Sequence, residues 1–164
     1  INVGVGYELL LRNYWSYGTI FGGSQNSELG VKLRLNLTAF GIRDIVYNRW
    51  NRFFMGAGLS GQRETPFDDT TNIYDIAGFF TTVWKVYKYT NPKLWVDSDI
   101  AFLPYLTGDW RYRIDFNLSP RVGIIGNTLQ IGFTFYYTYD SRPPSNASSL
   151  FDWGINFELT YTLH

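Results

Sequence analysis

The sequence contains no cysteine and a single histidine, His164, which is its last residue. Without cysteine no disulfide framework can form, and one histidine is too few for a Cys/His metal site. A hydrolase of the Ser/His, Asp/His or Cys/His kind is hard to build for the same reason, since its base would be the terminal residue. We therefore expect no catalytic residue, no metal and no cofactor, and a protein that is not an enzyme.

Charge is scarce as well. Charged residues make up 17% of the chain, against roughly 25% in an average soluble domain. The 14 basic and 14 acidic residues cancel, so nothing suggests a polyanionic partner, and we expect no binding to nucleic acid. No apolar run approaches the roughly 18 residues of a membrane-spanning helix.

Aromatic side chains are abundant instead, at 20% of the chain, and they recur at every second position. Residues 151–163 alternate strictly, with Phe151, Trp153 and Ile155 facing one way and Asp152, Gly154 and Asn156 the other. The alternation slips near Phe40 and Gly41, where we expect a bulge. The same period marks earlier runs, at residues 1–11, 14–22, 28–47, 50–62, 73–89, 93–105, 109–118 and 129–139. The pattern is less decisive in 14–22, and it is weakest in phase in 73–89, whose two faces it does not assign.

This pattern predicts one all-β domain over residues 1–164, an antiparallel up-and-down barrel with about nine visible strands. In a soluble barrel the apolar face would be the core, whereas in an outer-membrane barrel it would meet lipid. The aromatic residues would overfill the narrow interior of a small barrel, which favours the membrane arrangement. The side chains that we expect to face lipid are Trp110, Tyr112, Phe116, Phe133, Phe135, Tyr137, Trp153, Phe157 and Tyr161.

Lengths of the connections give a second indication. Counted back from a periplasmic C-terminus, the expected outer connections are 140–149, 106–108, 63–72 and 23–26. The expected inner turns lie at 126–127, 91–92, 48–50 and 13, and they are mostly the shorter ones, as in bacterial barrels. Because such barrels have even strand numbers, we expect a total of ten or more strands, with at least one upstream of Ile1.

Polar side chains on the opposite face are expected to line the lumen. Asp97 and Asp99 could lie beside Arg111 and Arg113 of the next strand. They could form a carboxylate pair for acid/base chemistry or a cation site, but a neutralising salt-bridge network in a narrow lumen is favoured. The candidate lumen residues are Glu8, Lys32, Arg34, Asp97, Asp99, Arg111, Arg113, Asp115, Asp152 and Glu158.

The last run also resembles an assembly signal. Asp152, Gly154, Phe157 and Leu159 fit the polar-x-Gly-x-x-aromatic-x-hydrophobic pattern by which the barrel-assembly machinery recognises terminal strands. The alternative is that Gly154 merely relieves crowding inside the barrel.

Several segments together resemble the salt-induced outer-membrane protein family, a Gram-negative group whose biochemical role is not established. They are Leu29-Gly-Val-Lys-Leu-Arg-Leu-Asn-Leu-Thr, Met55-Gly-Ala-Gly-Leu-Ser-Gly-Gln-Arg-Glu, Asp97-Ser-Asp, Asp109-Trp-Arg-Tyr-Arg, Tyr139-Asp-Ser-Arg-Pro-Pro and Asp152-Trp-Gly. The resemblance implies a bacterial outer-membrane location, with membrane lipid, the barrel-assembly machinery and other envelope proteins as partners. A plugged structural or partner-binding barrel is the expected function, with a small-solute channel or a soluble lipid-binding barrel as alternatives.

Overall fold

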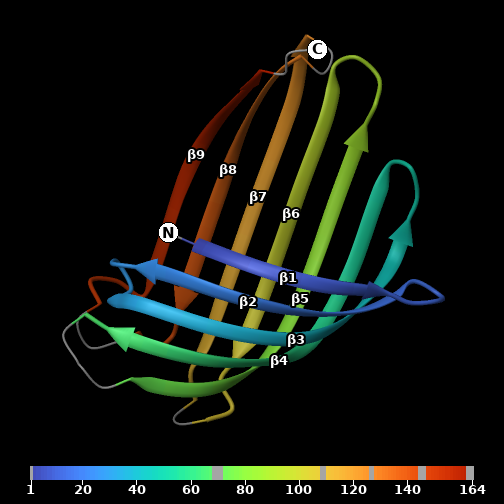
Figure 1. The fold of residues 1–164 in the computed structure, drawn as a ribbon. Helices are drawn as coiled ribbons and strands as arrows, with labels where there is room; N and C mark the ends of the chain where they lie inside the picture. Colours follow the sequence, from blue (N-terminus) through green and yellow to red (C-terminus); the bar gives the residue numbers. More distant parts are fainter. Residues whose placement is uncertain (1, 68–71, 108–109, 126–127, 144–146, 162–164) are drawn as a thin grey trace.

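The computed structural model describes residues 2–67, 72–107, 110–125, 128–143 and 147–161, and these residues form one antiparallel sheet (Figure 1). The nine strands pair in sequence order, each with its neighbours along the chain. Their bounds are β1 Asn2–Leu10, β2 Trp15–Asn26, β3 Val31–Tyr47, β4 Asn51–Pro66, β5 Ile73–Lys88, β6 Lys93–Pro104, β7 Tyr112–Ile125, β8 Leu129–Asp140 and β9 Phe151–Tyr161. The expected all-β, up-and-down class is confirmed.

Each expected run contains a strand, but several bounds differ. β2 continues to Asn26, so the connection expected at 23–26 lies at 27–30 instead. β7 continues past Leu118 to Ile125, and it includes Pro120. The expected start of this run at Asp109, the inner turn at 126–127 and the chain ends at 1 and 162–164 lie outside the described residues.

The bulge expected near Phe40 and Gly41 is wrong. Phe40 pairs in regular register with Gly18 on one side and with Gly58 on the other. A Cβ added to Gly18 would lie 2.5 Å from the Phe40 ring, so the missing side chain makes the room that a bulge would otherwise provide. The register of β3 shifts near its two ends instead, between Val31 and Leu33 and between Asp44 and Val46.

The connections alternate between two ends of the sheet, as the antiparallel order requires. We call one the short-turn end, with connections 11–14, 48–50, 89–92 and 126–128. We call the other the long-connection end, with connections 27–30, 67–72, 105–111 and 141–150. At the short-turn end Asn13 and Tyr14 adopt φ values of 64° and 63°, which reverse the chain between β1 and β2.

The sheet is strongly curled, and β1–β4 lie across β6–β9 (Figure 1). At the long-connection end the two halves touch, because Asn26 Nδ2 donates a 2.7 Å hydrogen bond to Asp152 Oδ2. Ser148 Oγ likewise donates to the Glu28 carboxylate at 2.8 Å. Among the described residues β1 pairs only with β2 and β9 only with β8. Full closure of the barrel and an even strand number therefore stay predictions.

Register divides the side chains between two faces, because directly opposed residues share a face. The concave face carries Arg34, Glu64 and Asp140, all of them buried. The convex face carries Leu37 and Trp153, which are 58% and 57% exposed. Buried apolar side chains in the described part of the chain are few, namely Leu29, Val31, Ile42, Ala77, Leu103 and Tyr105.

Candidate functional site

Five charged side chains from distant parts of the chain meet on the concave face near the long-connection end. We call Arg34, Glu64, Asp75, Arg111 and Asp140 the interior charge cluster. Arg34 Nη2 lies 2.8 Å from Glu64 Oε2 and 3.6 Å from Asp140 Oδ2. Arg111 Nη2 lies 2.6 Å from Asp140 Oδ2 and 3.2 Å from Glu64 Oε2, and its Nη1 lies 3.8 Å from Asp75 Oδ2. The cluster thereby joins β3, β4 and β5 to β8 across the curled sheet.

The cluster is shielded from solvent. Glu64 is 2% exposed and Asp140 is fully buried, so each carboxylate depends on its arginine partners for compensation of the lost hydration. Burial lowers the pKa of Arg111, but its hydrogen bond to Asp140 and the nearby Glu64 carboxylate outweigh that effect and raise its pKa above the ordinary value. Arg111 is therefore a fixed cation that holds two buried carboxylates.

A neutral hydrogen-bonded chain continues from the cluster along the concave face. The Arg111 guanidinium lies over the Tyr105 ring, 4.6 Å from its centre. The Tyr105 hydroxyl donates to Gln62 Oε1 at 3.0 Å, and Thr38 Oγ1 donates to Ser60 Oγ at 2.9 Å. The buried polar groups of this chain of contacts therefore satisfy one another, as expected of a filled polar interior.

A second group of polar contacts lines β6–β9, and it corrects the expected pairing. Asp97 pairs with Ser119 and forms an ion pair with Arg121, not with Arg111 or Arg113. Asp99 accepts a 2.9 Å hydrogen bond from Asn117. The expected register was wrong because the hairpin between β6 and β7 closes with Pro104 opposite Tyr112. This places Arg113 opposite Leu103, at the end of β6 far from Asp97.

Arg113 and Asp115, two positions apart on β7, form an ion pair with each other at 2.9 Å. Asp115 also accepts a 3.0 Å hydrogen bond from Thr138 of β8. The remaining residues expected on the polar face divide into two groups. Asp152 is held by Asn26, whereas Glu8 and Glu158 lie on the concave side of β1 and β9 and are exposed.

Lys32 departs from the expected arrangement. It lies where the register of β3 shifts between Val31 and Leu33, and it is exposed. Val31 takes the inward place opposite Pro66 and is buried. The irregular pairing at the start of β3 therefore reverses the alternation that placed Lys32 inside.

The aromatic residues expected to meet lipid lie on the convex face or beside it. Ring centres of Phe116 and Phe135 are 6.1 Å apart, those of Phe135 and Trp153 are 6.5 Å apart, and those of Phe133 and Phe157 are 6.5 Å apart. Trp110 lies outside the strands in connection 105–111 and is 94% exposed. Tyr112, Tyr137 and Tyr161 occupy convex positions of β7, β8 and β9.

Gly154 lies opposite Tyr136 on the concave face, and this contact gives the glycine a packing role. A Cβ at position 154 would lie 2.6 Å from the Tyr136 ring. The other residues of the proposed assembly signal take their alternating places, with Asp152 inward and Phe157 and Leu159 outward. Their recognition by the assembly machinery stays a prediction.

A packing role against Tyr136 and a role in recognition by the assembly machinery lead to different predictions for substitutions of Gly154. We expect Gly154→Val to lower the yield of folded protein, and Tyr136→Ala to restore it in the double variant if the defect is the clash with the ring. The measurement is the folded fraction on a semi-native gel after expression in cells. A double variant as poorly assembled as Gly154→Val alone would instead favour recognition of the glycine.

Three members of the interior charge cluster were missed from the sequence. Glu64 falls beyond the expected end of its strand at Gln62, Asp140 falls in an expected loop, and Asp75 lies in the run whose phase is weakest. Continuing the alternation of Ser60 and Gln62 by one step would have found Glu64. Their meeting with Arg34 and Arg111 depends on the curl of the sheet, which alternation does not encode.

The described ranges contain no group of three or more acidic, histidine or cysteine side chains placed to hold a metal ion. No helix in the described part of the chain is long and apolar enough to cross a membrane. Comparison with protein-family models, with curated proteins and with solved structures gives no match.

Proposed function

We propose that the protein is an integral β-barrel of the bacterial outer membrane with a plugged interior, serving as a structural or partner-binding barrel of the cell envelope. The observation that carries the proposal is the inverted polarity of the sheet. The buried groups of the concave face include Arg34, Glu64 and Asp140, while large apolar side chains cover the convex face. Such a surface suits contact with lipid and is costly in water.

The distribution of charge supports a lipid-facing convex side. Every acidic residue within a described strand lies at a concave position; these are Glu8, Asp44, Glu64, Asp75, Asp97, Asp99, Asp115, Asp140, Asp152 and Glu158. The strand positions outside the concave face that carry charge hold Lys32, Arg43, Arg63 and Lys88, and each lies toward a strand end. Arginine and lysine near the ends of spanning strands can reach the headgroup region.

The interior charge cluster favours a plugged barrel over the alternative of a small-solute channel. Its ion pairs join Arg34 of β3 directly to Asp140 of β8, and they join Glu64 of β4 to Asp140 through Arg111. Such a network would obstruct a solute path through the interior. We expect purified protein in planar lipid bilayers to show no stable unitary conductance. Discrete, reproducible current steps would contradict the plugged interior and leave a channel as the function.

Membrane location is tested by fractionation of cells that express the protein. We expect it to sediment with outer membranes, to resist extraction by carbonate, and to migrate faster on a gel when it is not boiled, as folded barrels do. The third proposal, a soluble lipid-binding barrel, predicts a soluble protein that stays monomeric without detergent. That outcome would contradict the membrane proposal.

A further inference from the structure

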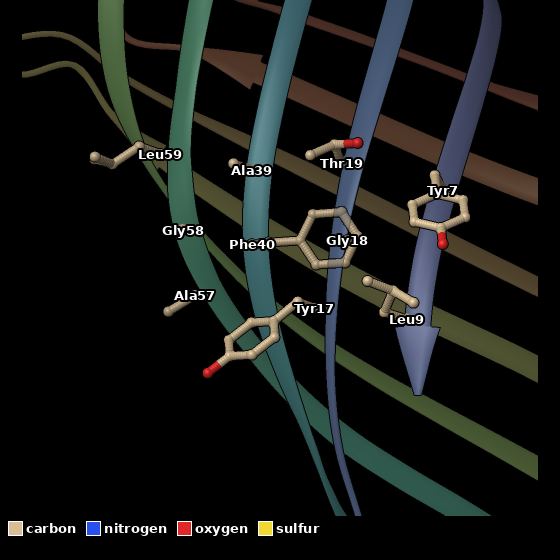
Figure 2. Close-up of a pocket in the computed structure, with 11 residues that line it drawn as sticks. Tyr7, Leu9, Tyr17, Gly18, Thr19, Ala39, Phe40, Ala57, Gly58 and Leu59 are labelled. Atoms are coloured by element: carbon tan, nitrogen blue, oxygen red, sulfur yellow. The ribbon is translucent and has the colours of Figure 1, made fainter. Parts of the chain in front are cut away.

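The convex face has a hollow of about 480 Å³ that crosses β1–β4. Figure 2 shows Tyr7 and Leu9 of β1 at one margin and Leu59 of β4 at the other. Tyr17 of β2 stands within it, and its ring lies beside Gly41. The walls are therefore aromatic and aliphatic side chains that the convex face exposes elsewhere as well.

Two adjacent rows of opposed residues form the floor of this hollow. In the first row Thr19 opposes Ala39, and in the second Gly41 opposes Ala57. Short side chains at these positions leave a depression between the larger residues of β1 and β4. Phe40 belongs to the concave face, where its ring packs against Gly18, so it supports the floor from behind.

A cation stands at the short-turn side of the hollow. Arg43 lies two residues beyond Gly41 on the same face, in the next row, opposite Trp15 and Met55. Its guanidinium lies 5.5 Å from the centre of the Trp15 ring. Arg43 is exposed and forms no ion pair with any described residue. The convex positions of the described strands carry no acid that could neutralise it.

We infer that the hollow and Arg43 together bind one anionic phospholipid, with an acyl chain in the hollow and the phosphate on the guanidinium. This inference rests on the proposed membrane location. An apolar groove that ends at an unneutralised cation complements a molecule with an apolar chain and an anionic head. Trp15 and Tyr17 beside it have the amphipathic character of residues at the membrane interface.

The charge around the hollow favours a lipid over a second copy of the chain. A copy placed on the hollow would bring its own convex face, whose strand charges are also basic, against Arg43. Like charges at such a contact would repel each other. The phosphate of a phospholipid instead supplies the missing negative charge.

Native mass spectrometry of the detergent-released protein tests the site, with dimyristoyl phosphatidylglycerol, dimyristoyl phosphatidylcholine and inorganic phosphate as probes. We expect one phosphatidylglycerol per protein, retained better than phosphatidylcholine, and no retention of phosphate. Ala57→Leu fills the floor and should abolish retention. Arg43→Gln should weaken retention of phosphatidylglycerol by about tenfold, the scale of one charge-assisted hydrogen bond, toward the level of phosphatidylcholine.

Two control variants introduce the same residues, Gln and Leu, elsewhere on the convex face. Arg63→Gln removes an exposed arginine at the long-connection end. Gly61→Leu adds a side chain where a Cβ would meet nothing within 4 Å. Both controls should retain phosphatidylglycerol as the unchanged protein does. Heat-modifiable migration on a gel shows whether each variant still folds, and so distinguishes loss of lipid binding from loss of the folded barrel.

Three results would overturn the inference. If Ala57→Leu retained phosphatidylglycerol undiminished, the lipid would bind elsewhere. If the protein retained the two lipids equally and Arg43→Gln changed nothing, the phosphate would have no role in binding. Dimers that Ala57→Leu converts to monomers would assign the hollow to a second copy. A protein that is soluble without detergent would instead contradict the proposed function itself.

Discussion

Arg111→Leu is expected to destabilise the folded protein strongly. The substitution removes the side chain that donates to Asp140 at 2.6 Å and 2.9 Å and lies 3.2 Å from Glu64. It leaves Glu64 and Asp140 buried with Arg34 as the one remaining arginine of the interior charge cluster, at a cost of about 3–5 kcal/mol. The measurement is the urea concentration at which the fast-migrating folded band disappears from a semi-native gel.

A double-mutant cycle separates this effect from a general loss of packing. Asp140→Asn reduces the uncompensated charge, so Arg111→Leu should cost less in its presence than in the unchanged protein. Arg63→Leu, at an exposed convex position of the same end of the sheet, should change the midpoint little. Simple additivity of Arg111→Leu and Asp140→Asn would show that their ion pair does not stabilise the fold.

Phe135→Arg is expected to have the next largest effect, through the depth of the residue in the membrane. Phe135 lies at a convex position in the middle of β8, opposite Leu118 and Ile155. A charge at the midplane of a barrel's lipid face costs about 2–4 kcal/mol, whereas near an interface it costs about 0–1 kcal/mol. The free energy of unfolding in lipid vesicles, from reversible urea titration, measures the loss.

Phe53→Arg is the matched control, because it makes the same replacement on the convex face close to the short-turn end. We expect a much smaller loss there than at Phe135. Equal losses at the two positions would contradict a lipid-facing convex side, since a face in water has no dependence on depth. Improved solubility without detergent in both variants would favour the soluble barrel.

The strands could be predicted from the sequence because the two faces of most of them differ in polarity. In residues 151–163 the alternation of Trp153 and Phe157 with Asp152 and Glu158 admits one strand and one choice of faces. Strand ends were less certain, since β4 and β7 continue past the residues where their patterns weaken. The bulge expected at Phe40 failed because the slip in the alternation marks an apolar ring on the concave face, and glycines on both neighbouring strands accommodate this ring in regular register.

The interior charge cluster could not be predicted from alternation, because its members meet through the curl of the whole sheet. Period two places Arg34 on the polar face but says nothing about which strand lies across the interior from it. Arg111 was expected beside Asp97 and Asp99, whereas the register of the β6–β7 hairpin places it at the long-connection end, where it meets Asp140 of β8. Such a contact can be predicted only when the register of several strands is known.

The contacts that hold the long-connection end together have a consequence for the order of folding. Each ladder of the sheet forms between consecutive strands, so hairpins can be added one after another with short loops to close. The hydrogen bond between Asn26 and Asp152 instead spans 126 residues. Such a contact is slow to form and needs β9 in place, so β2 remains without its distant partner until the last strand has been added. The contacts that bring the first and last strands of the curled sheet together therefore form late in folding, after the ladders between consecutive strands.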